Sequence, residues 1–123
     1  MDLNTLTYGI RGAAFTVHRC LGPGLLESAY EKCMLHELRK QGYRAESQLL
    51  LPITYDEIKV DGGYRIDILV EDLIILELKA VEALDPIHTA QLLTYLRLAD
   101  KPLGLLMNFN VRNMQHGIKR YIQ

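Results

Sequence analysis

The stretch Leu73-Ile74-Ile75-Leu76-Glu77-Leu78-Lys79-Ala80 decides the fold that we expect for this chain. Its first four residues are apolar on both faces of an extended chain, which is typical of a central strand buried on both sides. Glu77 and Lys79 continue that strand on one face, because successive side chains of a strand alternate. Charges that continue a buried strand are costly unless they are paired or bound to metal. These two residues are therefore the first candidates for chemistry.

Other short runs rich in Ile, Leu, Val and Tyr predict further strands. Two of them, Leu49 to Tyr55 and about Tyr64 to Val70, are bounded by turn residues and form a three-stranded meander with Leu73 to Ala80. Leu103 to Phe109 predicts a fourth strand, which should lie parallel to an earlier one because it follows a helix. The tail from Met114 to Ile122 fits either a short helix or a last edge strand.

Three segments have the three- and four-residue apolar spacing of amphipathic helices. The first should begin near a cap at Asn4 or Thr5 and end at Gly22-Pro23-Gly24; the second runs from about Leu25 to Gln41, and the third from Pro86 to Ala99. We expect the buried residues to be Leu3, Leu6, Ile10, Ala13, Ala14, Val17 and Leu21, then Leu26, Tyr30, Met34 and Leu38, then Ala90, Leu93 and Leu96.

The composition predicts one globular α/β domain that spans residues 1–123, with 49% apolar and 24% charged residues. The net charge of -1 supplies none of the global basic field that is typical of nucleic-acid-binding proteins, so nucleic acid would be held locally or through a metal. Cys20 and Cys33 lack metal-ligand spacing, and no apolar run approaches the ~20 residues of a membrane span. We expect a cytoplasmic protein without membrane contact.

Asp67 joins Glu77 only if the turn between their strands has the right length. A two-residue turn would put Asp67 on the face opposite Glu77. A three-residue turn, Glu71 to Leu73, would pair Val70 with Ile74 and Asp67 with Glu77. We predict the second register or an equivalent bulge.

Two carboxylates in one small space repel each other, and a hard cation such as Mg²⁺ relieves that repulsion. Mg²⁺ also takes phosphate oxygens and lowers the pKa of a bound water, while a lysine such as Lys79 could orient that water or stabilise developing charge. Spacing alone equally fits a solvated ion pair at the end of a strand. The pattern thus leaves a metal-dependent phosphodiesterase site and a structural ion pair as alternatives.

A resemblance to a known family rests on five segments, in order along the chain: Gly24-Leu25-Leu26-Glu27-Ser28-Ala29-Tyr30, Arg65-Ile66-Asp67, Ile75-Leu76-Glu77-Leu78-Lys79, Ala90-Gln91-Leu92-Leu93-Thr94-Tyr95 and Leu105-Leu106-Met107-Asn108-Phe109. Together they resemble the GxxExxY proteins of the PD-(D/E)xK nuclease superfamily, which includes RecB-like exonucleases and archaeal Holliday-junction resolvases. The resemblance implies a restriction-endonuclease-like fold. Its αβββαβ core would carry a mixed four- to five-stranded sheet flanked by helices and preceded by an extra N-terminal helix.

By this resemblance Asp67 and Glu77 are ligands of Mg²⁺ or Mn²⁺, and Lys79 is the catalytic lysine. Glu27 matches an acid that relatives bring to the metal from the helix before the sheet, although the helix dipole favours a carboxylate there in any case. Gln91 matches the QxxxY pattern of RecB-like relatives, on a helix that faces the site. In this chain Ile66 precedes Asp67, where the family motif is named for a proline that many members lack.

Three further side chains are candidates for substrate contact. Arg65 shares a face with Asp67 and could clamp a phosphate. Tyr30 and Tyr95 could also touch substrate, although such tyrosines are more often core residues. We expect a divalent-metal-dependent nuclease that acts on DNA, in preference to RNA. It would act alone or as a homodimer. The alternative is a catalytically silent nuclease-fold module that binds nucleic acid or a protein partner.

Overall fold

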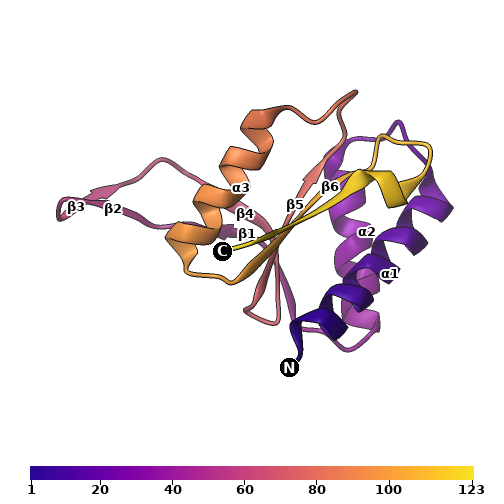
Figure 1. Cartoon of the computed structure of the whole chain (residues 1–123), viewed down its shortest axis with the longest axis horizontal. Coiled ribbons are helices and arrows are strands. Elements are labelled where there is room, and N and C mark those ends of the chain that lie inside the picture. Colours follow the sequence, from indigo (N-terminus) through magenta and orange to yellow (C-terminus); the bar gives the residue numbers. More distant parts are fainter.

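The computed structural model describes all of residues 1–123 and contains a mixed five-stranded sheet with helices on both faces (Figure 1). The strands lie in the order β1 (Ala45–Leu50), β4 (Arg65–Val70), β5 (Ile74–Lys79), β6 (Leu103–Asn108) and β7 (Ile118–Ile122). β5 and β6 are parallel, and the other neighbouring pairs are antiparallel. The predicted αβββαβ order with a fourth strand parallel to an earlier one is confirmed, and the tail forms a short 3₁₀ helix, η1 (Met114–Gly117), before the edge strand β7.

β5 is the central strand of the sheet, and every residue from Ile74 to Leu78 is buried. Val70 pairs with Ile74, which is the predicted register, and the pairing continues as far as Ile68 with Leu76. The turn between the strands is tight because its residues Glu71 and Asp72 both have positive φ angles. The next two residues in the register are Asp67 and Glu77, which therefore lie just beyond the paired part of the two strands.

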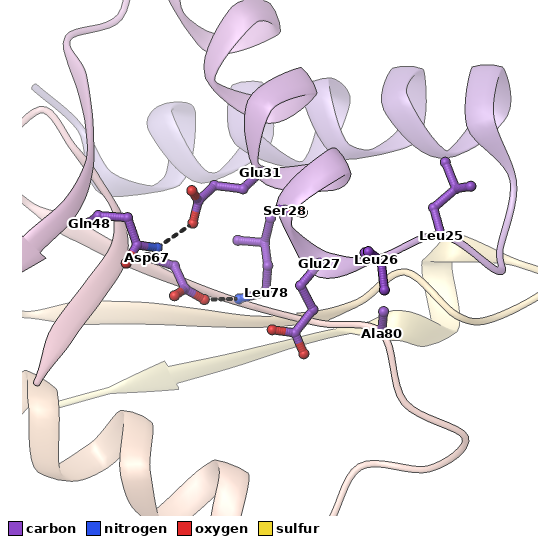
Figure 2. A pocket seen from close by; sticks show the side chains of 9 residues that line it. All are labelled: Leu25, Leu26, Glu27, Ser28, Glu31, Gln48, Asp67, Leu78 and Ala80. Atoms are coloured by element: carbon purple, nitrogen blue, oxygen red, sulfur yellow. Dashed lines mark hydrogen bonds between the residues drawn. The ribbon is translucent and has the colours of Figure 1, made fainter.

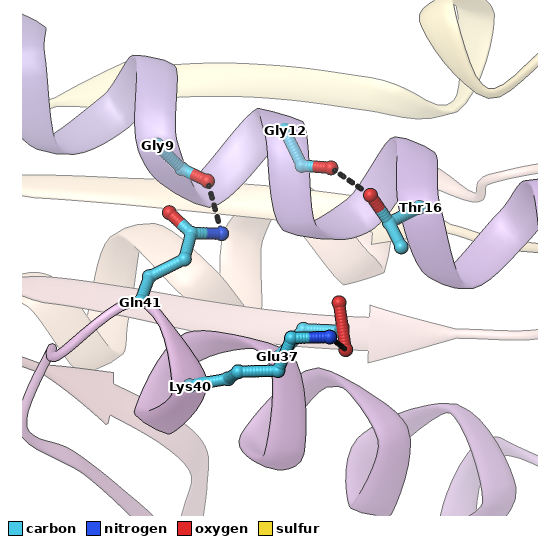
Figure 3. Close-up of polar contacts among 6 residues, drawn as sticks. All are labelled: Gly9, Gly12, Thr16, Glu37, Lys40 and Gln41. Atoms are coloured by element: carbon cyan, nitrogen blue, oxygen red, sulfur yellow. Dashed lines mark hydrogen bonds and ion pairs between the residues drawn. The ribbon is translucent and has the colours of Figure 1, made fainter.

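Two helices, α1 (Leu3–Leu21) and α2 (Glu27–Lys40), cover one face of the sheet and share one buried cluster with it. They also touch each other through polar groups, since the Gln41 amide donates to the Gly9 carbonyl at 3.4 Å (Figure 3). The side chain of Asp2 caps α1, in place of the expected Asn4 or Thr5. Two residues predicted to be buried are exposed: Leu26 precedes the first turn of α2, and Leu21 ends α1.

The opposite face is covered by α3 (Pro86–Ala99), which buries Leu92, Tyr95 and Leu96. The prediction was wrong for Ala90 and Leu93, which are exposed. Leucines occur on most sides of this helix, so their spacing does not define one buried face. None of the helices in the structure combines the length and apolar character needed to cross a bilayer.

A small hairpin projects from the sheet between β1 and β4 (Figure 1). It consists of β2 (Ile53–Tyr55) and β3 (Ile58–Val60), joined by Asp56 and Glu57 with positive φ angles, as a two-residue hairpin turn requires. The predicted strand from Leu49 to Tyr55 is therefore two strands. Pro52 lies at the break, where it has no N–H to give to a sheet.

Candidate functional site

The sheet changes its hydrogen bonding where Asp67 and Glu77 meet. The backbone N–H of Asp67 donates to Oε2 of Glu77 at 3.0 Å, and the N–H of Leu78 donates to Oδ2 of Asp67 at 2.8 Å. Each acid thus takes a main-chain donor from the strand that carries the other acid. The two carboxylates that the predicted register brings together are held side by side between β4 and β5.

The strand pairing on the other side of Asp67, between β4 and β1, is also irregular. Gln48 of β1 would be its partner in the register, yet the pairing skips this position and Gln48 has a φ of 52°. On β4, Ile68 belongs to the cluster under α1 and α2, whereas Ile66 belongs to the cluster under α3. Residues two apart on a regular strand share a face, so the strand turns over at Asp67. Asp67 is therefore free of regular pairing on both sides, at the boundary between the two cores.

Burial makes this acid pair unfavourable when both groups are charged. Glu77 is only 2% exposed, and burial, followed by the charge of Asp67, raises the pKa of Glu77 to about 8. Burial also raises the pKa of Asp67, with further contributions from the charges of Glu31 and Glu27. A divalent cation would offset this repulsion, and carboxylate oxygens are the ligands that Mg²⁺ prefers. The donor set of Asp67 and Glu77 therefore fits such an ion.

Lys79 ends β5 next to this pair and is half-buried. Its charge lowers the pKa of both acids, but its ammonium forms no ion pair with either of them. The Lys79 carbonyl accepts from the N–H of Phe109 at 2.9 Å. Asn108, which pairs with Lys79 across the sheet, fixes the loop that follows through two hydrogen bonds to the backbone of Val81. Asn108 was not predicted from the sequence. The signal that could have identified it is a polar residue at the end of an apolar strand.

A cavity of about 520 Å³ opens between the start of α2 and Asp67. Figure 2 shows Glu27, Glu31, Gln48 and Asp67 around it, with the Gln48 amide donating to Oε1 of Glu31 at 2.7 Å. Glu31 was not predicted from the sequence, although it lies four residues after Glu27 and hence on the same face of the helix. No three His, Cys, Asp or Glu side chains lie close enough to hold a metal ion together, so the structure does not bring Glu27 to the pair as a third ligand.

The remaining predicted site residues separate into two groups. Arg65 is exposed, and its guanidinium donates to the carbonyl of Gln48 at 3.3 Å, beside the cavity. On the α3 side, the Gln91 amide donates to the hydroxyl of Tyr95 at 3.0 Å. Burial raises the pKa of Tyr95, the hydrogen bond with Gln91 lowers it, and the charges of Glu77 and Asp67 raise it. Tyr95 is buried in the cluster under α3, which also contains Ile66 and Ile75.

Tyr30 has no access to a substrate, which corrects the prediction of substrate contact. Its side chain is fully buried and its ring stacks on Phe109 at 4.6 Å between centroids. The hydroxyl donates to the carbonyl of Gly22 at 2.7 Å and accepts from the N–H of Leu25 at 3.1 Å. Tyr30 therefore holds the turn that leads into α2 and to Glu27.

The chain matches the model of a known protein family. The family model described as the PD-(D/E)XK nuclease superfamily matches residues 4–121. No protein of curated function and no solved structure matched the chain significantly. The match spans nearly the whole chain, and the three helices and mixed five-stranded sheet form an α/β restriction-endonuclease-like fold with an N-terminal helix. This chain therefore belongs to the PD-(D/E)XK nuclease superfamily.

Proposed function

We propose that this protein is a cytoplasmic, divalent-metal-dependent nuclease that hydrolyses phosphodiester bonds. We expect DNA, in preference to RNA, as its substrate. The observation that carries the proposal is the buried pair of Asp67 and Glu77, in which each carboxylate accepts a main-chain hydrogen bond from the other acid's strand. The half-buried Lys79 ends the strand that carries Glu77. Bound Mg²⁺ or Mn²⁺ would polarise a phosphate and make a water more acidic. The structure of the pair supports this role because its charges lack an ion-pair partner.

Each residue of the proposed site has a distinct task. Asp67 and Glu77 hold the cation, and the N–H groups that bind their carboxylates keep those oxygens in place. Lys79 orients water or stabilises charge in the transition state. Gln91 and Tyr95, joined by a hydrogen bond, are the residues that we propose for the site from α3. Glu27 lines the cavity outside the acid pair, and Arg65, beside that cavity, is the residue that would meet a phosphate.

We assign the protein to the GxxExxY proteins within this superfamily. Two of the residues that give the family its name, Gly24 in the turn before α2 and Tyr30 within α2, fix the shape of that turn. Gly24 has a φ of 102°, a conformation that favours glycine, and the Tyr30 hydroxyl binds both ends of the turn. Glu27 is the first residue of α2 and lines the cavity next to Asp67. The motif thus places an acid at the edge of the cavity that Asp67 lines.

The test is cleavage of labelled duplex, single-stranded and branched DNA and of RNA, in Mn²⁺ and in EDTA. We expect cleavage only with Mn²⁺, and its loss in Asp67→Asn, because asparagine can still accept from Leu78 but lacks the charge. Asp100→Asn is the matched control, since Asp100 is exposed and asparagine tolerates its left-handed conformation. Cleavage by Asp67→Asn at the wild-type rate would contradict the proposal.

A second function, a catalytically silent module that binds nucleic acid or a protein partner, is favoured by one observation. Only two acids meet in the structure, and no third one completes a group that could hold a metal ion. Such a module would bind one of the substrates equally well in EDTA and in Mn²⁺ and would cut none of them. The same set of assays therefore separates the two functions.

A further inference from the structure

The strand β1 changes faces at Gln48, just as β4 changes faces at Asp67. Ala45 belongs to the cluster under α1 and α2, whereas Leu49 packs against the cluster under α3. These two residues are four positions apart, so in a regular strand they would share one face. The change falls between them, where Gln48 has a φ of 52°. Both strands therefore reverse their faces at one pair of residues, Gln48 and Asp67, and we call this feature the face reversal.

Backbone hydrogen bonds on either side of the face reversal show the same irregularity. The N–H of Leu51 donates to the carbonyl of Tyr64, and the N–H of Glu71 donates to the carbonyl of Arg44. Bonded pairs recur at every second residue of a regular antiparallel ladder, yet Tyr64 and Glu71 are seven residues apart. The regular alternation of the ladder is therefore interrupted between them.

The face reversal affects the side of the sheet that Asp67 reaches. Leu69, two residues further along β4, belongs to the cluster under α3. A regular strand would put the side chain of Asp67 on that same face. Asp67 instead lines the cavity at the start of α2, where its carboxylate accepts from the N–H of Leu78 (Figure 2). The face reversal thus accounts for the presence of this acid at the cavity.

The conformation of Gln48 needs support from outside its own strand. A φ in the left-handed region is uncommon for a glutamine, and such a conformation persists only where the surrounding structure imposes it. Gln48 is exposed and belongs to neither core cluster, so apolar packing does not impose it. Two side-chain hydrogen bonds hold the residue instead. Its amide donates to Oε1 of Glu31 at 2.7 Å, and its carbonyl accepts from the guanidinium of Arg65 at 3.3 Å.

We propose that Glu31 is a positioning residue of the acid pair, which binds the Gln48 amide and so holds the face reversal that brings Asp67 to the cavity. This inference deepens the proposed function and rests on it, because it concerns the placement of a proposed metal ligand. Glu31 acts from outside the ligand set, since no three His, Cys, Asp or Glu side chains lie close enough together to hold an ion. Groups that orient a ligand in this way typically contribute about 10- to 100-fold in metal affinity.

Amide hydrogen exchange in EDTA tests the placement of Asp67 without metal or cleavage. The N–H groups of Asp67 and Leu78 are both hydrogen-bonded within the acid pair. Glu31→Ala should speed their exchange by about tenfold, the effect of losing one hydrogen bond to a carboxylate, while the N–H of Leu105 in β6 exchanges as before. Wild-type exchange at Asp67 and Leu78 would overturn the proposal. So would equal acceleration at Leu105, because it would indicate a general loss of stability.

Two further variants of α2 serve as controls. Glu31→Gln keeps an oxygen that can accept from Gln48, so slow exchange at Asp67 and Leu78 should be preserved. Glu37→Ala removes an acid from the same helix, one that forms an ion pair with Lys40 at 3.6 Å (Figure 3), and should also preserve it. Acceleration in Glu37→Ala equal to that in Glu31→Ala would attribute the effect to α2 in general and would contradict the proposal.

Gln48→Gly tests whether the effect of Glu31 passes through Gln48. Glycine adopts positive φ angles without steric cost, and it has no side chain for Glu31 to bind. Two substitutions that act through one contact are not additive, so Glu31→Ala should change the exchange rates no further in the glycine background. A full additional acceleration by Glu31→Ala in that background would defeat the proposed route.

Mn²⁺ affinity links the placement of Asp67 to the proposed function. Calorimetric titration should give a dissociation constant about 10- to 100-fold higher in Glu31→Ala and close to the wild-type value in Glu31→Gln. An equal loss of affinity in both variants would make the charge of Glu31 the cause and would overturn its role in positioning.

The two proposals fail separately. Faster exchange at Asp67 in Glu31→Ala, in a protein that binds no Mn²⁺, defeats the metal site and leaves the role of Glu31 in placing Asp67. Wild-type Mn²⁺ affinity and wild-type cleavage in Glu31→Ala defeat the positioning role and leave the nuclease.

Discussion

The backbone N–H of Asp67 and a carboxylate oxygen of Glu77 lie 3.0 Å apart, at the point where β4 and β5 stop pairing. The return contact, from the N–H of Leu78 to Asp67, makes the arrangement reciprocal. Main-chain donors therefore fix both side chains, while the charges of the two acids oppose each other. A substitution by asparagine or glutamine therefore removes the charge of an acid and keeps its position, because the amide oxygen accepts from the same N–H group.

Divalent cations should stabilise the folded protein. A ligand that binds only the folded state adds about 2.7 kcal/mol at 100 times its dissociation constant, which raises the melting temperature by several degrees. We expect this shift with millimolar Mn²⁺ in the wild type and its absence in Asp67→Asn, measured by differential scanning fluorimetry. In EDTA, Asp67→Asn should melt at or above the wild-type temperature because the repulsion is gone. Identical melting of the wild type in Mn²⁺ and in EDTA would count against the metal site.

Without metal, the stability of the wild type should fall as pH rises. Burial raises the pKa of Glu77 from 4.5 to about 8, so between these values the folded state keeps a proton that the unfolded chain has lost. The free energy of unfolding then decreases with pH across that window. We expect Glu77→Gln in EDTA to lose less stability than the wild type between about pH 5 and about pH 8, by at least about 1 kcal/mol.

The control for this measurement is Glu46→Gln, which removes an exposed carboxylate from β1. Its melting temperature should follow the wild-type curve at every pH. Parallel curves for Glu77→Gln and the wild type would mean that Glu77 titrates as an ordinary glutamate.

The sequence predicted the acid pair well because strand geometry is local. The apolar run before Glu77 and the turn from Glu71 to Leu73 were sufficient for the register that the structure contains. The distortion on the other side of Asp67 could not be predicted in this way. On that side the side chain of Gln48 bonds to Glu31, 17 residues earlier in the chain, and the local sequence pattern does not contain such a contact.

The helices were harder to orient than to locate. The bounds of α3 agree with the prediction, yet its buried face does not, because Leu92, Leu93, Leu96 and Leu98 surround the helix and only the sheet selects among them. The hairpin was missed for a related reason. Its strands have three residues each and none of them is fully buried, so alternation over such lengths carries little signal.

Tyr30 should matter for stability and not for chemistry. Tyr30→Phe keeps the stacking on Phe109 but leaves the Gly22 carbonyl and the Leu25 N–H without their partner. A lost buried hydrogen bond costs about 1–3 kcal/mol, which urea denaturation can measure. The Mn²⁺-dependent stabilisation should persist, and Tyr8→Phe, at an exposed site, should change neither quantity. Full stability together with lost cleavage would instead assign the hydroxyl of Tyr30 to the reaction.

Lys79 separates the nuclease from the silent module most clearly. Lys79→Met keeps the apolar stem of this half-buried side chain and removes its charge. Because Lys79 forms no ion pair with the acids, the Mn²⁺-dependent stabilisation should survive the change. If Lys79 acts on water or on developing charge, turnover should fall by about 10²- to 10³-fold while binding in Ca²⁺ is retained.

For a protein that only binds nucleic acid, the same substitution has a different signature. Affinity should fall modestly, and the slope of its salt dependence should decrease by about one phosphate contact. Lys119→Met, at an exposed site on β7, controls for the general loss of one positive charge. The deciding measurement is therefore the ratio of lost turnover to lost binding in Lys79→Met. A ratio near one contradicts a catalytic lysine, because a group that acts only in the transition state lowers the rate far more than it lowers binding.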